Sequence, residues 1–187
     1  MSLQIARNNR NWRDGQPPQR PLLPPELVEV FVLFINTTNR TLDLYWICER
    51  ENDNIYLTLK PNEEVRVNTY NTHSWFFRDY YTGESMHVRS KRLFSPVRIR
   101  VPHPQRPDQM CDVRSQVLIH FPLRTLKENC LWLIVKMLVR SGDSPREAIE
   151  SYFIPMTLKQ QLLALLGSIE TYRTQANTRR PRFMVRR

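Results

Sequence analysis

The chain has 187 residues, of which 41% are hydrophobic and 25% are charged, so it is long enough for one compact domain or two small ones. Only four glycines occur, which excludes the glycine-rich phosphate loops of the common nucleotide-binding enzymes. No apolar run reaches the roughly 20 residues of a membrane helix, and the polar N-terminus lacks the apolar core of a signal peptide. We therefore expect a soluble, intracellular protein that does not bind membranes.

The formal net charge of +10 points to nucleic acid as a partner, but most of this charge lies at the two ends of the chain. Residues 1–20 carry +3 and residues 173–187 carry +6, which leaves +1 for residues 21–172. Such a nearly neutral body lacks the basic face of a dedicated nucleic-acid binder. We predict solvated basic tails at 1–21 and 173–187, with nuclear targeting by the C-terminal run as an open alternative.

Metal-binding and catalytic motifs are missing from the sequence. Cys48, Cys111 and Cys130 are far apart and form no C-x-x-C pair, so neither a disulfide framework nor a zinc site is predicted. No G-x-S-x-G elbow, no H-E-x-x-H and no carboxylate pair in an apolar context occurs. We expect no metal, no other cofactor and no enzymatic activity.

Residues 27–121 contain short runs of β-branched and aromatic residues between turn-forming clusters. No helical pattern separates the runs, so the crossover helices of a parallel α/β sheet are excluded and an antiparallel β-sandwich or barrel is predicted. The clearest alternation places Val97, Ile99 and Val101 on one apolar face. The predicted strands cover residues 27–35, 42–48, 54–59, 63–69, 73–79, 86–93, 97–101 and 113–121.

Helical signals begin after Pro122. Capping boxes at Thr125, Ser144 and Thr157 predict helices over residues 126–140, 145–153 and 158–172, and Gly142 is placed to end the first. The first helix is apolar on two sides, whereas a surface helix needs only one apolar stripe. Its second apolar face needs a cover, which either the sandwich or a separate protein would supply.

A small group of aromatic and polar residues lies on or beside neighbouring predicted strands, namely Trp46, Tyr56, Thr69, His73 and Trp75. Ordinary core packing of a sandwich explains each aromatic residue taken singly. His73 and Trp75, however, are two residues apart on a strand and so share one face. An imidazole beside an indole suits a small pocket with apolar walls and a polar floor.

These residues lie in a familiar pattern. The stretch YLTLKPNEEVRVNTYNTHSWFFRD at 56–79, preceded by Trp46 and followed by TLKENCL at 125–131, closely resembles the von Hippel-Lindau tumour suppressor family. The resemblance runs from Val32 to Val139, weakens through 140–172 and is absent from both tails. It implies a β-sandwich, which we place at 22–122, and a helical domain, which we place at 123–172.

The resemblance also implies a function. Family members act as non-catalytic substrate receptors of cullin-RING ubiquitin ligases and bind hydroxylated proline in the hypoxia-inducible factor alpha subunit. By position, Trp46, Tyr56 and Trp75 correspond to walls around the pyrrolidine ring, and Thr69 and His73 to the partners of its hydroxyl. Plain proline would leave both polar groups unpaired, so discrimination by about four orders of magnitude is expected. This chain departs from the family at Thr69, where Ser is typical, and at Asn68, where His is typical.

Two further matches concern partner proteins. The spacing Thr125-Leu126-x-x-x-Cys130-x-x-x-Ile134 matches the BC-box, by which family members bind elongin C. Leu126, Cys130 and Ile134 follow one another at four-residue steps and form one stripe, which the resemblance identifies as the elongin C face. The segment Ile154-Pro155-x-x-Leu158 resembles the cullin box, and an interhelix turn explains it almost as well.

The resemblance therefore implies a complex with elongin C, elongin B, a cullin and a RING-box subunit, in cytoplasm and nucleus. Two alternatives are open on the residues alone. One is a β-barrel nucleic-acid module that stacks bases on Trp46 and Trp75 and whose binding depends steeply on salt. The other is a purely structural adaptor without a ligand pocket.

Overall fold

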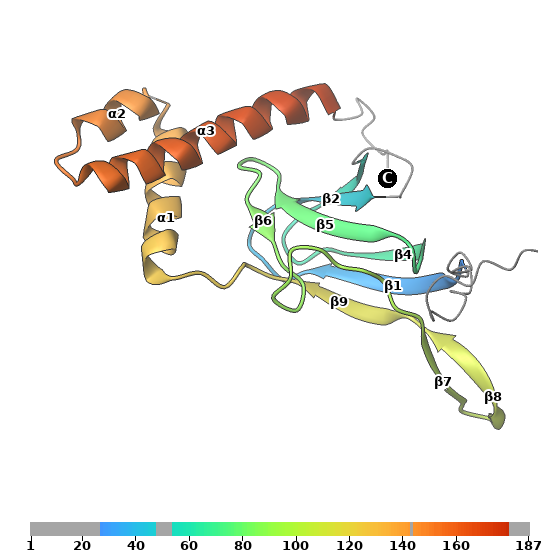
Figure 1. Cartoon of the computed structure of the whole chain (residues 1–187). Coiled ribbons are helices and arrows are strands. Elements are labelled where there is room, and N and C mark those ends of the chain that lie inside the picture. The colour runs from blue at the N-terminus through green and yellow to red at the C-terminus, as the bar shows by residue number, and fades with distance from the viewer. Residues whose placement is uncertain (1–26, 48–53, 143, 180–187) are drawn as a thin grey trace, which may run out of the picture.

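The computed structural model describes residues 27–47, 54–142 and 144–179. Two β-sheets and a two-stranded ribbon are followed by three helices, the last of which reaches back over one of the sheets (Figure 1). The predicted class, mainly β with a C-terminal helical unit, is confirmed. One sheet has the order β4 (Glu64–Tyr70), β1 (Glu29–Asn36) and β9 (Ser115–Ile119). The other has the order β3 (Asn54–Leu59), β2 (Leu42–Ile47), β5 (Ser74–Asp79) and β6 (Ser85–Met86).

The two sheets pack through side chains that alternate along the strands. In β1, every second residue is buried, as the two-residue period of a strand with one inward face requires. The ring of Phe34 from β1 lies 5.1 Å from the ring of Trp75 and 5.3 Å from that of Phe77, both on β5. Aromatic contacts at these distances contribute beyond simple burial and tie the two sheets together.

Strand pairing differs from the prediction in one respect. All paired strands are antiparallel except β1 and β9, which are parallel. The chain runs through the whole second sheet between these two strands, so it can return in the same direction without a crossover helix. A single parallel pair of strands is therefore compatible with the lack of crossover helices.

The predicted strand at 86–93 is wrong beyond its first residues. β6 ends at Met86, and only isolated bridges follow, which pair His87 with His120 and Val88 with Lys91. Arg89 and Ser90 have φ angles of 49° and 61°, so the chain reverses there in a tight turn. The sequence of this segment gives no signal for the turn, because neither Arg89 nor Ser90 is glycine or proline.

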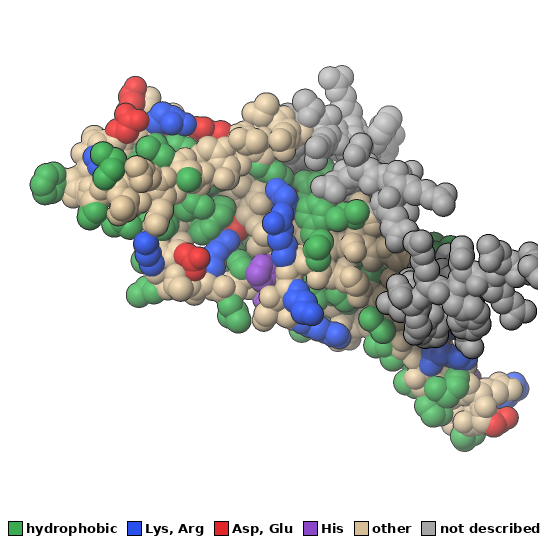
Figure 2. Space-filling view, viewed as in Figure 1, with side chains coloured by type: hydrophobic (Ala, Val, Ile, Leu, Met, Phe, Trp, Pro, Cys, Tyr) green, Lys and Arg blue, Asp and Glu red, His purple; other side chains and the backbone are tan. Residues whose placement is uncertain are grey.

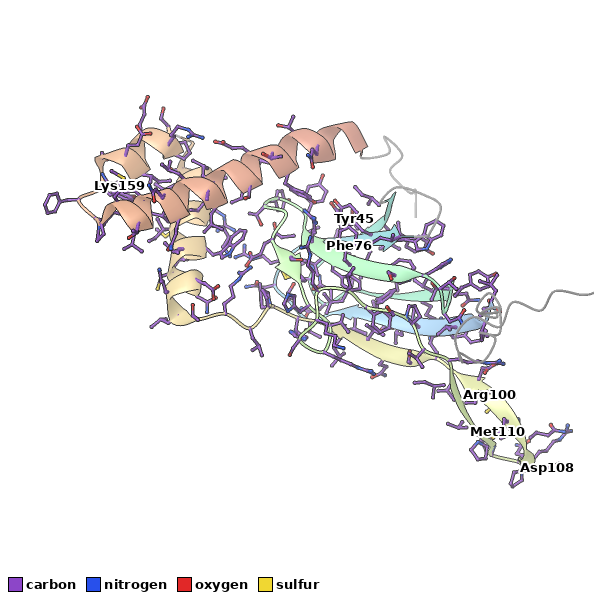
Figure 3. All side chains as sticks on the ribbon, viewed as in Figure 1. Tyr45, Phe76, Arg100, Asp108, Met110 and Lys159 are labelled. Carbon is purple, nitrogen blue, oxygen red and sulfur yellow. The ribbon has the colours of Figure 1, made fainter. Side chains whose placement is uncertain are left out.

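A two-stranded ribbon of β7 (Ile99–His103) and β8 (Arg106–Val113) extends away from the sandwich (Figures 1 and 3). The predicted strand at 97–101 begins two residues too early, β8 was not predicted, and the strand predicted at 113–121 is β9 alone. Val97, Ile99 and Val101 are 69%, 40% and 36% exposed. These three side chains therefore do not form a buried face among the described residues, because no second layer packs against the ribbon.

The helices are α1 (Leu126–Ser141), α2 (Pro145–Ser151) and α3 (Met156–Arg179). The capping box of Thr125 and Glu128 is confirmed, and Gly142 ends α1 with φ of 81°. The other two capping boxes are wrong: Ser144 forms no side-chain cap, and Thr157 lies inside α3. Because α3 continues to Arg179, the start of the predicted C-terminal tail is helical. The predicted N-terminal tail and residues 180–187 lie outside the described residues.

The helical unit has its own small core, formed by Leu131, Val135, Ile149, Leu162, Leu166 and Ile169. It also contacts the sandwich through α3, whose Tyr172 packs on the stacked rings of Tyr45 and Phe76 (Figure 3). The ring of Tyr172 lies against Gly83, whose φ is 69°, and any Cβ there would collide with the ring. No helix in the described part of the chain is both long and apolar enough to cross a bilayer.

Candidate functional site

Thr69, His73 and Trp75 form a hydrogen-bonded group at the end of the sandwich where β4 passes to β5. The Nε1 of Trp75 donates to the Oγ1 of Thr69 at 3.1 Å, and the same oxygen lies 2.9 Å from the Nδ1 of His73. Thr69 and Trp75 are almost fully buried, while His73 is half-buried. The backbone N–H of His73 donates to the carbonyl of Tyr70, which closes the turn and holds the imidazole over Thr69.

Aromatic rings surround this group. Trp46 on β2 is the register partner of Trp75, and its ring lies 5.1 Å from the imidazole of His73. Tyr56 on β3 lies edge-on to Trp75 at 5.2 Å and is 49% exposed, so it forms the outer wall. The structure thus brings all five predicted residues together. Sequence reasoning missed Tyr70, whose ring lies 5.2 Å from His73 on the open side.

Burial lowers the pKa of His73, so the imidazole is neutral at pH 7. The buried hydroxyl of Thr69 accepts from Trp75, and its own proton needs an acceptor, which the Nδ1 of His73 supplies. This arrangement favours the tautomer that carries its proton on Nε2. Thr69 and His73 therefore form a hydrogen bond with each other. The sequence predicted that plain proline would leave both groups unpaired, but in this geometry it leaves neither of them unpaired.

Asn68, one of the two departures from the family pattern, lies exposed beside this group on β4. Its Oδ1 accepts a hydrogen bond from Arg114 at 2.9 Å. Arg114 also donates to the carbonyls of Val32 and Val67, so its guanidinium is held in place at the edge of the sheet. The amide of Asn68 is thus oriented by Arg114 toward the sheet edge.

The outward face of α1 carries an apolar stripe. Leu126 is 80% exposed and Cys130 is also exposed, whereas Ile134 is half-buried and packs against the helical core. Leu133 and Met137 are 58% and 62% exposed and lie on the same side as Leu126. The structure therefore separates Ile134 from the first two residues of the predicted elongin C set and adds Leu133 and Met137, which that set did not include. We call Leu126, Cys130, Leu133 and Met137 the α1 stripe.

The three residues of the predicted cullin box lie at the α2–α3 junction. Ile154 and Leu158 are half-buried and pack against the helical core, while Pro155 is exposed just before α3. Phe153 and Met156 beside them are fully and 67% exposed. The exposed apolar surface at this junction is therefore formed mainly by residues that the motif does not include.

Catalytic and metal chemistry find little support in this geometry. No three His, Cys, Asp or Glu side chains within the described ranges are close enough to share a metal ion. Thr69 and His73 resemble a nucleophile and base, but no carboxylate is seen to orient the imidazole among their hydrogen-bond partners in the described structure. The arrangement groups one buried polar pair with aromatic rings, which is the composition expected of a small binding pocket.

Comparison with known proteins agrees with this geometry. The family model of the VHL beta domain matches residues 26–100, which include all five residues of the pocket. The chain is also 64% identical to Protein Vhl of Drosophila melanogaster over 183 residues, which span 97% of this chain and the whole of that relative. Identity at this level over nearly the full length extends beyond the β domain to the helices. The chain belongs to the VHL family.

Proposed function

We propose that the chain is the substrate receptor of a cullin-RING ubiquitin ligase and binds a hydroxylated proline of the hypoxia-inducible factor alpha subunit. The observation that carries this proposal is the Thr69–His73 pair, with its oxygen and nitrogen 2.9 Å apart beneath aromatic walls. A five-membered ring fits between flat aromatic faces, and its hydroxyl would then reach both polar atoms. The hydroxyl would donate to Nδ1 of His73 and accept the proton of Thr69.

In this proposal the α1 stripe docks on elongin C, which links the receptor to elongin B. The exposed apolar surface at the α2–α3 junction, around Pro155, faces the cullin, which brings the RING-box subunit. Large exposed apolar residues on one helix face typically mark such a docking surface. The receptor supplies proximity, other subunits supply the ubiquitin chemistry, and the complex works in cytoplasm and nucleus.

Selectivity for hydroxyproline then arises from hydrogen bonds that are gained. Because Thr69 and His73 already pair with each other, the inserted hydroxyl replaces their one bond by two, whereas plain proline leaves the pair intact. The net gain of one bond, at about 1 to 2 kcal/mol, corresponds to a preference of about 5-fold to 30-fold. This range lies below the four orders of magnitude expected from sequence.

The decisive experiment is calorimetry on the chain co-expressed with elongins B and C. It compares two peptides that differ only in hydroxylation of one proline. Tighter binding of the hydroxylated peptide than of the plain one supports the proposal, while equal binding of both contradicts it. A nucleic-acid module would instead bind with steep salt dependence. Trp75 is 2% exposed, which weighs against base stacking on its ring. In the proposed receptor Trp75 therefore contributes mainly its N–H to Thr69 and not an open ring face.

A further inference from the structure

A cavity of about 330 Å³ lies between the sandwich and the helical unit, away from the proline pocket. Three parts of the chain form it: the β1–β2 turn, the β5–β6 loop, and the facing sides of α1 and α3. Its lining residues are Arg40, Asp79, Tyr81, Thr82, Lys136, Val139, Arg140 and Arg173. Figure 2 shows Lys and Arg side chains gathered on this side, where the helices meet the sandwich. We call it the interdomain cavity.

The charge of the lining is strongly positive. Four of the lining residues are cationic and only Asp79 is acidic. The Oδ1 of Asp79 already accepts from the backbone N–H groups of Tyr81 and Thr82, at 2.9 and 2.7 Å, and from the Thr82 hydroxyl. This carboxylate therefore stabilises the β5–β6 loop, and its single negative charge leaves the lining with a formal charge of +3.

The cations of the lining lack enough anionic partners. Lys136 pairs with Glu84 at 3.0 Å, but Glu84 also pairs with Arg124, so one carboxylate serves two cations. Neither Arg40 nor Arg140 forms an ion pair within the described residues, and the Nε of Arg40 is buried without an acceptor there. A buried donor without an acceptor is unfavourable, and a bound anion would satisfy it.

We propose that the interdomain cavity binds a small anion that carries two or more phosphate groups. Guanidinium groups present forked donors that match phosphate oxygens, and three arginines together with Lys136 line one cavity. The volume falls within the usual range for small-molecule sites and is too small for an extended acidic peptide. This inference does not depend on hydroxyproline binding, which uses other residues.

Such a ligand would link the two units of the fold. Arg40 comes from the sandwich, Arg140 from α1 and Arg173 from α3, where the Nε of Arg173 donates to the carbonyl of Tyr81. An anion bound by all three would reduce the repulsion among them and stabilise this arrangement of helices and sheets. We therefore expect the thermal midpoint of the chain to rise with ligand concentration.

The test uses the full chain with elongins B and C, titrated with inorganic tripolyphosphate at physiological salt. Calorimetry should show saturable binding, and Arg140→Gln should weaken it by about tenfold or more, because one charge-assisted contact is lost. Arg106→Gln is the matched control: it removes the same charge from the exposed ribbon, leaves both basic tails intact and should leave binding unchanged. Arg40→Gln should weaken binding as well.

Three results would overturn the proposal: no binding of tripolyphosphate, equal weakening by Arg106→Gln and Arg140→Gln, or binding only of a peptide with adjacent phosphoserines. The second result would mean that net charge alone attracts the anion. The third would mean that the cavity belongs to a peptide-binding surface. Binding of the hydroxylated peptide, measured on the same variants, should be unaffected. Failure of this inference is therefore distinguishable from failure of the proposed receptor function.

Discussion

The indole of Trp75 donates its only N–H to the hydroxyl oxygen of Thr69 at 3.1 Å, and this bond fixes the role of every polar atom in the pocket. Trp75 can only donate, so the oxygen of Thr69 accepts and its proton is left for the Nδ1 of His73, 2.9 Å away. The hydroxyl at position 69 therefore acts both in the fold and in the proposed recognition of hydroxyproline.

Thr69→Val removes this hydroxyl and keeps the shape of the side chain. The buried N–H of Trp75 then loses its acceptor, so we expect the free energy of unfolding to fall by about 1 to 3 kcal/mol. Affinity for the hydroxylated peptide should fall as well. Thr69→Ser, which restores the residue typical of the family, is the control and should keep binding. Chemical denaturation and calorimetry measure the two effects, and a Val variant with unchanged stability would contradict the assigned bond.

The pKa of His73 predicts how binding depends on pH. Burial lowers this pKa from 6.5, so the unfolded chain takes up the proton more readily than the folded one. Stability from His73 is therefore complete above pH 6.5, declines as the pH falls through that value, and levels off below the folded pKa. Peptide binding needs Nδ1 as an acceptor, so affinity should fall as the pH drops through the same range.

Calorimetric titration with the hydroxylated peptide measures this dependence. Titrations between about pH 5 and pH 8 cover the pH range in which histidine side chains titrate. His87 has a pKa lowered by burial as well, so the stability profile alone does not isolate His73. The binding profile does, because His87 lies outside the pocket. His103→Asn on the ribbon is the control and should leave the profile unchanged. An affinity that rises toward acid pH would contradict the proposed role of the neutral imidazole.

How far the sequence predicts the pocket depends on the range of the contacts. His73 and Trp75 lie two residues apart, so local alternation already places them together, and the family pattern adds Trp46 and Tyr56. The sequence offers His73 a hydroxyl at either Thr69 or Ser74, and it does not specify the hydrogen bond to Thr69 that the structure shows. This bond arises because the tight turn after Tyr70 folds His73 back over Thr69, a local geometry that residue spacing does not specify.

The ribbon and the third helix show why the remaining fold was harder to predict. β8 contains Arg106, Pro107 and Asp108, which are poor strand formers, and it is extended because it pairs with β7. α3 continues into the Arg-rich segment at 173–179, where composition favoured a solvated tail. In the ribbon the neighbouring strand supplies the stabilisation, so local preference is a weak guide there.

The α1 stripe predicts that binding and stability can be separated. Leu126 is 80% exposed, so Leu126→Glu should change the free energy of unfolding by less than about 0.5 kcal/mol. The same change should abolish co-purification with elongin C, because it places a charge in an apolar interface. Leu131→Ala, on the buried side of α1, is the opposite control and should destabilise the helical unit by about 2 to 5 kcal/mol. Retained binding by Leu126→Glu would remove this face from the proposed interface.

Glu84 connects the sandwich to the helices and is the strongest candidate for a long-range stabilising contact. It is only 2% exposed, and its two oxygens pair with Arg124 in the linker and Lys136 on α1. Both cations also lie over the ring of Trp132, at 4.7 and 5.7 Å from its centre. The carboxylate therefore neutralises two largely buried cations at once, and neither can return to water without breaking the junction.

Glu84→Ala should accordingly lower the free energy of unfolding by about 3 to 5 kcal/mol, since it leaves those cations buried and uncompensated. Asp112→Asn is the matched control: Asp112 also pairs with two arginines, Arg98 and Arg100, but on the exposed ribbon, where solvent screens such pairs and they contribute little to stability. Chemical denaturation followed by tryptophan fluorescence measures both variants. A Glu84→Ala variant as stable as Asp112→Asn would show that the contacts of α3, through Tyr172 and Arg173, hold the helices to the sandwich without Glu84.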